Sequence, residues 1–141
     1  MRVFILCFVL STFCFSSNPQ YEKSINIVTD HTNKLMWQDN IEVTQYLENY
    51  TTSKVYCDTL ILNGYIDWRM PSIKELQKIV DLNKKNSIDQ NFKFVMPNYY
   101  NTTTSFQKDD TYQWVVDFKS GKTITNKKRD KNYVRCVRDI K

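Results

Sequence analysis

The sequence predicts a single α+β domain in which two helices pack on antiparallel strands and one disulfide closes the fold. Three observations predict it: short runs rich in β-branched and aromatic residues, two segments with helical spacing, and two cysteines beyond an apolar leader. The chain has 141 residues, so removal of 17 leaves 124, enough for one core but not for two. We expect the domain to span residues 25–139.

An apolar leader occupies residues 1–17. Arg2 is followed by an apolar run over residues 3–10, and the small residues Ser16 and Ser17 end the segment. This order is typical of a secretory signal peptide. The run is shorter than the roughly 20 residues that a membrane helix needs, although a retained N-terminal anchor is the alternative. We therefore expect an exported protein with no membrane span in its mature part.

The first elements are a hairpin and a helix. Residues 25–28 alternate as a strand does, residues 30–34 are typical of a turn, and residues 35–38 resume extended structure. A helix is then predicted over residues 53–62, with Asn63-Gly64 as its C-cap. Its apolar stripe comprises Val55, Tyr56, Thr59, Leu60 and Leu62, with Cys57 on or near it.

A second helix has the clearer signal. Ser72 and Glu75 form a capping box, in which the hydroxyl and the carboxylate satisfy free backbone N–H groups. The predicted buried face comprises Ile73, Leu76, Ile79 and Val80. Strands follow: one over residues 112–118, a turn over residues 119–122 with a return strand after it, and a final strand over residues 133–137.

Cys57 and Cys136 are the cysteines that remain after the leader. In an oxidising compartment an even number of cysteines indicates disulfides, and these two allow one intramolecular pair. The alternative, a reactive or metal-binding thiol, lacks support because the sequence has no CxxC motif and a single histidine, His31. We predict the disulfide.

Several motifs in register give a resemblance to a known family. They are Asp30, Leu35–Asp39, Tyr56-Cys57, Asn63–Tyr65, Asp67–Ser72, Glu75-Leu76, Tyr112, Trp114–Phe118, Gly121 and Tyr133–Arg138. From about Ile25 to Arg138 the chain resembles the bacterial family named after the C-terminal domain of the Legionella collagen-like adhesin. One departure is visible. The family usually has a Trp-Ser-Ser-Thr-like segment after a tyrosine, and here residues 99–105 keep the hydroxyls without the tryptophan.

The resemblance implies a C-type-lectin-like fold and an adhesion module that recognises sulfated polysaccharides. It also implies a periplasmic, surface or secreted location in a Gram-negative-type bacterium. A calcium-dependent lectin site is not expected, because the segments 66–68 and 96–98 supply too few carboxylates to hold the ion. We predict no metal and no cofactor.

Positive charge is concentrated near the C-terminus. The chain carries a net charge of +5, and residues 119–141 hold nine basic residues against Asp130 and Asp139. Such an excess suits sulfate, phosphate or uronate groups, so an acidic glycan or envelope polymer is the expected partner. Nucleic acid is not expected for an exported protein without an aromatic-lined basic groove. The candidate polyanion-binding residues are Lys122, Lys127, Lys128, Arg129 and Lys131.

Two explanations of the basic segment remain open. The lysines can bind a ligand, or they can form a solvated loop that protects an exposed strand pair from aggregation. The corresponding functions are a non-catalytic binding module and a structural or assembly domain of the envelope that contacts a protein. Catalysis is not expected, since no GxSxG, HExxH or phosphate-binding glycine loop occurs. Arg69, Arg135 and Arg138 are predicted to pair with Asp67 or Asp117.

Overall fold

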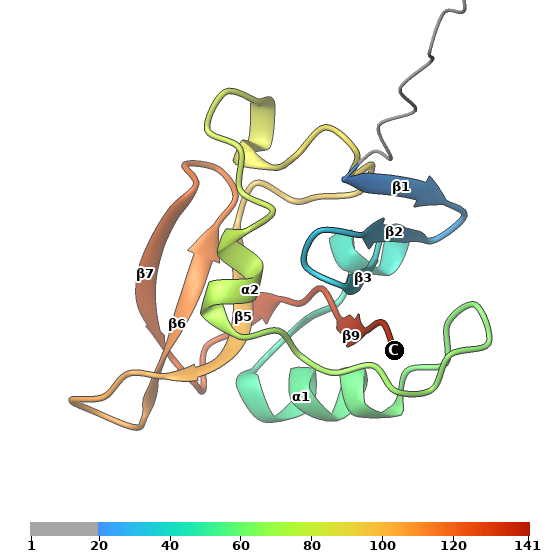
Figure 1. The fold of residues 1–141 in the computed structure, drawn as a ribbon. Helices are drawn as coiled ribbons and strands as arrows, with labels where there is room; N and C mark the ends of the chain where they lie inside the picture. Colours follow the sequence, from blue (N-terminus) through green and yellow to red (C-terminus); the bar gives the residue numbers. More distant parts are fainter. Residues whose placement is uncertain (1–19) are drawn as a thin grey trace, which may run out of the picture.

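The computed structural model describes residues 20–141, which form two sheets and two α-helices (Figure 1). The signal peptide predicted over residues 1–17 lies outside the described residues. The strands are β1 (Tyr21–Ser24), β2 (Ile27–Asp30), β3 (Leu35–Gln38), β4 (Leu47–Glu48), β5 (Tyr99–Ser105), β6 (Tyr112–Asp117), β7 (Lys122–Lys127), β8 (Asn132–Tyr133) and β9 (Val137–Asp139). The α-helices are α1 (Tyr50–Thr59) and α2 (Ile73–Gln77), and two 3-10 helices cover Ile41–Thr44 and Lys85–Ser87.

The four-stranded sheet has the order β1-β2-β3-β9, with every neighbouring pair antiparallel. Its register places Val28, Trp37 and Val137 side by side, and these three contribute to the larger core. Because side chains alternate across a strand, Ile27 and Met36 lie on the opposite face and pack in a second core with the cysteines. The sheet is therefore covered on both faces.

The five-stranded sheet has the order β4-β8-β5-β6-β7. β5 and β8 run parallel through the pair Tyr100–Tyr133, whereas the other neighbours are antiparallel. The expectation of purely antiparallel strands is wrong at this pair. β5 and β7 are both antiparallel to β6, and β8 keeps their common direction where it lies beside β5. The β6–β7 hairpin predicted from the sequence is confirmed.

The first hairpin and the first helix are shifted relative to their predictions. Residues 25–26 form the turn between β1 and β2 rather than the start of a strand. Helix α1 begins at Tyr50 because the Asn49 side chain accepts a hydrogen bond from the Thr52 N–H at 3.0 Å. Its buried residues are Ser53 and Cys57, whereas Val55 is 55% exposed. The predicted apolar stripe is therefore wrong at Val55, whereas Cys57, Leu62 and the partly buried Tyr56 and Leu60 do pack in the second core.

The turn Asn63-Gly64 was predicted as a helix C-cap, but the helix already ends at Thr59. The two residues instead close a tight turn in which Leu62 and Tyr65 exchange backbone hydrogen bonds. Their φ angles of +52° and +79° explain the residue types, since asparagine and glycine tolerate the left-handed region.

The final strand predicted over residues 133–137 is divided into β8 and β9. Residues 134–136 cross from the five-stranded to the four-stranded sheet and are fully buried. A continuous strand is not possible here, because Cys136 is bonded to α1 and Val137 already pairs with both Trp37 and Arg69. The capping box at Ser72 and Glu75 is confirmed at the start of α2.

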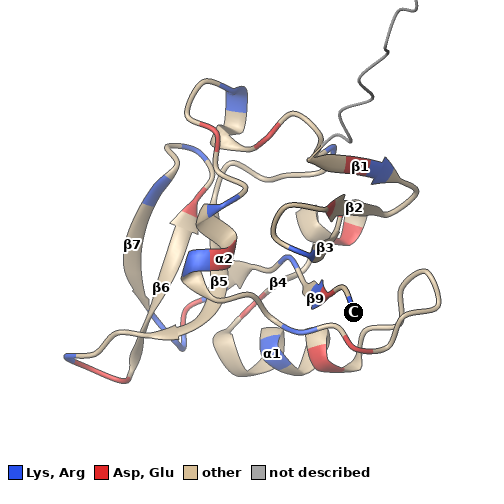
Figure 2. Cartoon of the chain, viewed as in Figure 1, with Lys and Arg blue, Asp and Glu red and all other residues tan. Residues whose placement is uncertain are grey.

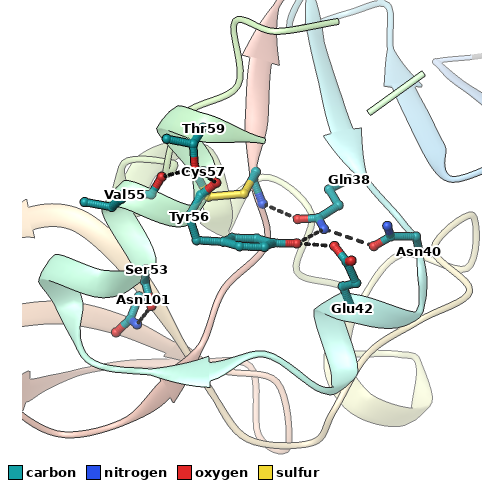
Figure 3. The surroundings of a disulfide bond; sticks show 10 residues. Gln38, Asn40, Glu42, Ser53, Val55, Tyr56, Cys57, Thr59 and Asn101 are labelled. Carbon is teal, nitrogen blue, oxygen red and sulfur yellow. Dashed lines mark hydrogen bonds between the residues drawn. A yellow bond between two sulfur atoms is a disulfide. The ribbon is translucent and has the colours of Figure 1, made fainter. Parts of the chain in front are cut away.

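The disulfide between Cys57 and Cys136 is present and joins α1 to the crossing segment (Figure 3). Gln38 in β3 accepts a hydrogen bond from the Cys136 N–H at 3.1 Å and donates to the Tyr56 hydroxyl at 2.8 Å. The Tyr56 hydroxyl in turn donates to Glu42 at 2.5 Å. The disulfide is thus surrounded by hydrogen bonds that link helix, sheet and crossing segment.

Replacing both cysteines, in Cys57→Ala/Cys136→Ala, should lower the free energy of unfolding by about 4 kcal/mol, because the bond closes a long loop in the unfolded chain. The sequence separation of the cysteines is 79 residues. Urea denaturation of the double variant and of the oxidised and reduced wild type measures the effect. The reduced wild type should match the double variant, and an unchanged unfolding midpoint would contradict a stabilising role.

Candidate functional site

Two turns meet at one end of the five-stranded sheet: the β5–β6 connection and the β7–β8 turn. The first residue of β6, Tyr112, pairs with the last residue of β7, Lys127. Beyond that pair, the Lys128 N–H donates to the Thr111 carbonyl at 2.8 Å. Figure 2 shows basic and acidic segments together at this end. The sheet register therefore places the basic turn against a second, partly acidic turn.

A pocket of about 620 Å³ lies between these turns. The volume falls within the roughly 300–1,000 Å³ of small-molecule sites. The residues that line it are Asp109, Thr111, Tyr112, Lys127, Lys128 and Arg129. We call it the turn pocket.

The three cations of the turn pocket differ in how they are held. The Lys128 ammonium donates to the Ser105 hydroxyl at 2.8 Å and lies 5.0 Å from the centre of the Tyr50 ring. The Lys127 ammonium lies 6.0 Å from the centre of the Tyr112 ring. Arg129 is exposed and forms no ion pair with any residue in the described range 20–141. Arg129 and Lys127 are therefore the groups best placed to reach a ligand.

The other two predicted candidates lie outside the turn pocket. Lys131 forms an ion pair with Glu48 at 3.4 Å. Lys122 begins β7 and pairs with Asp117, so almost the whole strand separates it from Lys127. At about 3.3 Å per residue that separation is roughly 16 Å. The structure thus brings together Lys127, Lys128 and Arg129.

An acidic residue that the sequence analysis did not select also lines the pocket. Asp109 Oδ1 accepts hydrogen bonds from the Thr111 hydroxyl at 2.6 Å and from the Thr111 N–H at 2.9 Å. The Thr111 hydroxyl and then the Thr111 N–H lower the pKa of the Asp109 carboxyl, and the nearby Lys127 charge acts in the same direction. The carboxylate is therefore ionised at neutral pH. The Asp-x-Thr spacing, typical of a side-chain-stabilised turn, was the available sequence signal.

Buried amides support the sheet close to the pocket. Asn101 Oδ1 accepts from Gln113 at 2.7 Å and from Asn132 at 3.0 Å. Asn101 Nδ2 donates to the Ser53 hydroxyl at 2.8 Å, as Figure 3 shows. These four residues connect α1, β5, β6 and β8, which fixes the strands on which the pocket turns are carried.

The three arginines singled out in the sequence are held in ion pairs within the fold. Arg138 pairs with Asp67 at 2.7 Å, as predicted, and its guanidinium lies 3.9 Å from the centre of the Tyr65 ring. The other two pairings were not predicted. Arg135 is fully buried and pairs with Asp39 at 3.0 Å, and Arg69 pairs with Glu75 at 2.7 Å and with Asp139 at 3.0 Å.

Asp117 pairs with no arginine among the described residues. Its carboxylate accepts hydrogen bonds from the Lys119 N–H at 2.9 Å and from the Ser120 hydroxyl at 2.8 Å. The prediction of an Asp117–arginine pair is therefore wrong, because this carboxylate stabilises the β6–β7 turn. Since Arg135 and Arg138 are committed to ion pairs, the basic character available to a ligand is smaller than the sequence count indicates.

Over residues 20–141, no group of three or more His, Cys, Asp and Glu side chains is arranged to hold a metal ion. Within the same range no helix has the length and apolar character needed to cross a membrane. Trp37 and Trp68 are buried in the two cores. Trp114 packs edge-on against Phe106, with ring centres 5.6 Å apart.

Comparison with known proteins adds one finding. The model of the family described as the Lcl C-terminal domain matches residues 26–138, which include both cysteines and every residue of the turn pocket. No curated protein matches the chain.

The ion pair between Arg69 and Glu75 should make stability depend on pH. Partial burial raises the pKa of the Glu75 carboxyl, but the Arg69 guanidinium and the Ser72 N–H outweigh it and lower that pKa below 4.5. The stabilisation is therefore complete above about pH 4.5 and is lost as the pH falls through the lower, folded-state value. Glu75→Gln should destabilise the protein at pH 7. It should also make the free energy of unfolding decrease less steeply as the pH falls.

Urea denaturation between pH 7 and about pH 3 measures this dependence. Asp130→Asn is the matched control, because the exposed Asp130 carboxylate has no ion-pair partner within residues 20–141. If the free energy of unfolding falls equally steeply with decreasing pH in wild type and in Glu75→Gln, the stabilising role of the Arg69–Glu75 ion pair is contradicted.

Proposed function

The chain belongs to the family of the Lcl C-terminal domain, and from this premise we propose that it is an exported, non-catalytic binding and adhesion module for acidic or sulfated polysaccharide. The observation that carries the proposal is the turn pocket, in which Lys127, Lys128 and Arg129 surround a hollow bordered by Tyr112. Membership of an adhesin-associated family and a disulfide favour a periplasmic, secreted or cell-surface location.

We also propose that the α+β fold is C-type-lectin-like. Two helices, two sheets and a disulfide that joins α1 to the crossing segment near the C-terminus support this proposal. In such an arrangement the turns at one end of a sheet carry the variable, ligand-contacting residues on a fixed scaffold.

The pocket chemistry suits binding of an anionic sugar. Sulfate and carboxylate groups form charge-assisted hydrogen bonds with guanidinium and ammonium groups, and Arg129 and Lys127 are placed to form them. Tyr112 lines the same pocket and offers an aromatic surface for the apolar face of a sugar ring. The Thr111 hydroxyl is engaged by Asp109 within its own turn, so it stabilises the turn and is not assigned a reaction.

A structural or assembly role with a protein partner is the second candidate, and one observation favours it. Ile25, Ile61 and Ile66 are 81%, 73% and 72% exposed. They lie on two adjacent turns, because the Asn63 side chain donates to the Ile25 carbonyl at 2.7 Å. Clustered exposed apolar side chains are typical of protein contacts.

Lys127→Ala/Lys128→Ala/Arg129→Ala should weaken binding to heparin about ten- to hundredfold, because three cations that contribute roughly 0.5–1 kcal/mol each are lost. Wild-type retention on a heparin column should fall steeply between low and physiological salt. Elution salt and the dissociation constant at fixed ionic strength are the measurements. A thermal unfolding curve checks that the variant is folded.

Lys74→Ala/Lys84→Ala/Lys85→Ala is the matched control, since it removes the same charge at exposed positions outside the turn pocket. The control should elute close to wild type. Elution of the pocket variant together with wild type would contradict glycan binding at this site. Binding that persists in high salt would instead favour the protein-partner role.

A further inference from the structure

The turn pocket is not uniformly basic. Asp109 lines it together with the three cations, and Asp110 and Asp130 are exposed in the same two turns. The position of Asp109 is fixed, because Thr111 holds its Oδ1 atom through two hydrogen bonds. A site that bound anions through charge density alone would gain from the loss of this carboxylate, so its presence constrains the ligand.

The second carboxylate oxygen of Asp109 is available to a ligand. Oδ2 accepts no hydrogen bond from any residue in the described part of the chain. An ionised carboxylate can only accept hydrogen bonds, so it attracts hydroxyl or ammonium donors and repels sulfate or phosphate groups. The low pKa of Asp109 keeps this acceptor charged in neutral solution.

The rest of the lining fits a ligand that carries both anionic groups and donors. Arg129 and Lys127 supply cations, Tyr112 supplies an aromatic ring, and the volume of about 620 Å³ lies within the range of small-molecule sites. A pyranose with one anionic group and free hydroxyls would place its anion on the cations and its hydroxyls on Asp109. A densely charged chain would instead bring an anion against the carboxylate.

Building on the proposed glycan-binding function, we propose that Asp109 is a specificity-determining residue that makes the turn pocket prefer sparsely charged sugar chains with free hydroxyls over dense polyanions. Selectivity arises from repulsion of the wrong ligand as well as from attraction of the right one. Lys127, Lys128 and Arg129 provide the attraction, and Asp109 rejects ligands that lack a hydroxyl at the corresponding position.

Three probes test the preference: dextran sulfate of low substitution, dextran sulfate of high substitution with the same chain length, and inorganic polyphosphate. Dissociation constants are measured by calorimetry at one ionic strength and expressed per chain. Wild type should bind the low-substitution dextran sulfate at least as tightly as the other two. Asp109→Asn, which keeps an oxygen acceptor for Thr111, should tighten binding of polyphosphate and of the highly sulfated chain about five- to tenfold.

Two controls separate specificity from net charge. Asp110→Asn and Asp130→Asn each remove one negative charge from the same end of the molecule but not from the pocket lining. Neither control should change the ratio of the dissociation constant for polyphosphate to that for low-substitution dextran sulfate by more than about twofold. A change in both controls equal to that in Asp109→Asn would overturn the inference, because the effect would then depend on charge alone.

A third variant tests the sugar ring directly. Tyr112→Leu keeps an apolar residue in β6 and should weaken binding of low-substitution dextran sulfate while leaving polyphosphate binding unchanged. The outcomes also distinguish the two proposals. If wild type binds none of the probes, the glycan-binding function fails. If wild type binds them and Asp109→Asn leaves the selectivity unchanged, only the role of Asp109 fails.

Discussion

The structure depends on how residues 134–136 cross between the two sheets. Cys136 is fixed to α1 by the disulfide, and Arg135 is fixed to Asp39 at the end of β3. Arg135 also donates to the carbonyls of Gln38 and Phe94. A buried guanidinium is tolerated because its charge is paired with Asp39 and its amino groups have acceptors. One three-residue segment therefore holds helix, both sheets and the 93–94 loop together.

This crossing also determines where the candidate site can form. β8 lies beside β5, and residues 134–136, which follow β8, enter the crossing directly. The β7–β8 turn is therefore held at both ends by strands that are fixed in the same sheet. The Tyr50 N–H donates to the Lys128 carbonyl at 3.0 Å, so α1 supports the turn as well. The basic turn is consequently positioned by groups far from it in sequence, including the helix to which Cys136 is bonded.

Some features were predictable because their signals lie within a few residues of one another. The capping box at Ser72, the turn between β2 and β3 and the β6–β7 hairpin were recognised from local patterns. The predicted start of α1 was wrong because it followed apolar spacing, whereas the helix begins at the Asn49 cap and buries the polar Ser53 against Asn101. β5 was not recognised, since its Tyr99–Ser105 segment is mostly polar and is stabilised by partners in β6 and by the buried amides.

By itself the sequence determined the α+β class, the cysteine pair, the capped second helix and the family resemblance, because each depends on residue type and short spacing. Only the tertiary structure decided which charges are available. It paired Arg135 with Asp39 and Arg69 with Glu75, placed Lys122 far from Lys127, and brought Asp109 to the basic turn. The physical reason is that charge interactions depend on distance in space, and these distances follow from sheet register and from the crossing segment.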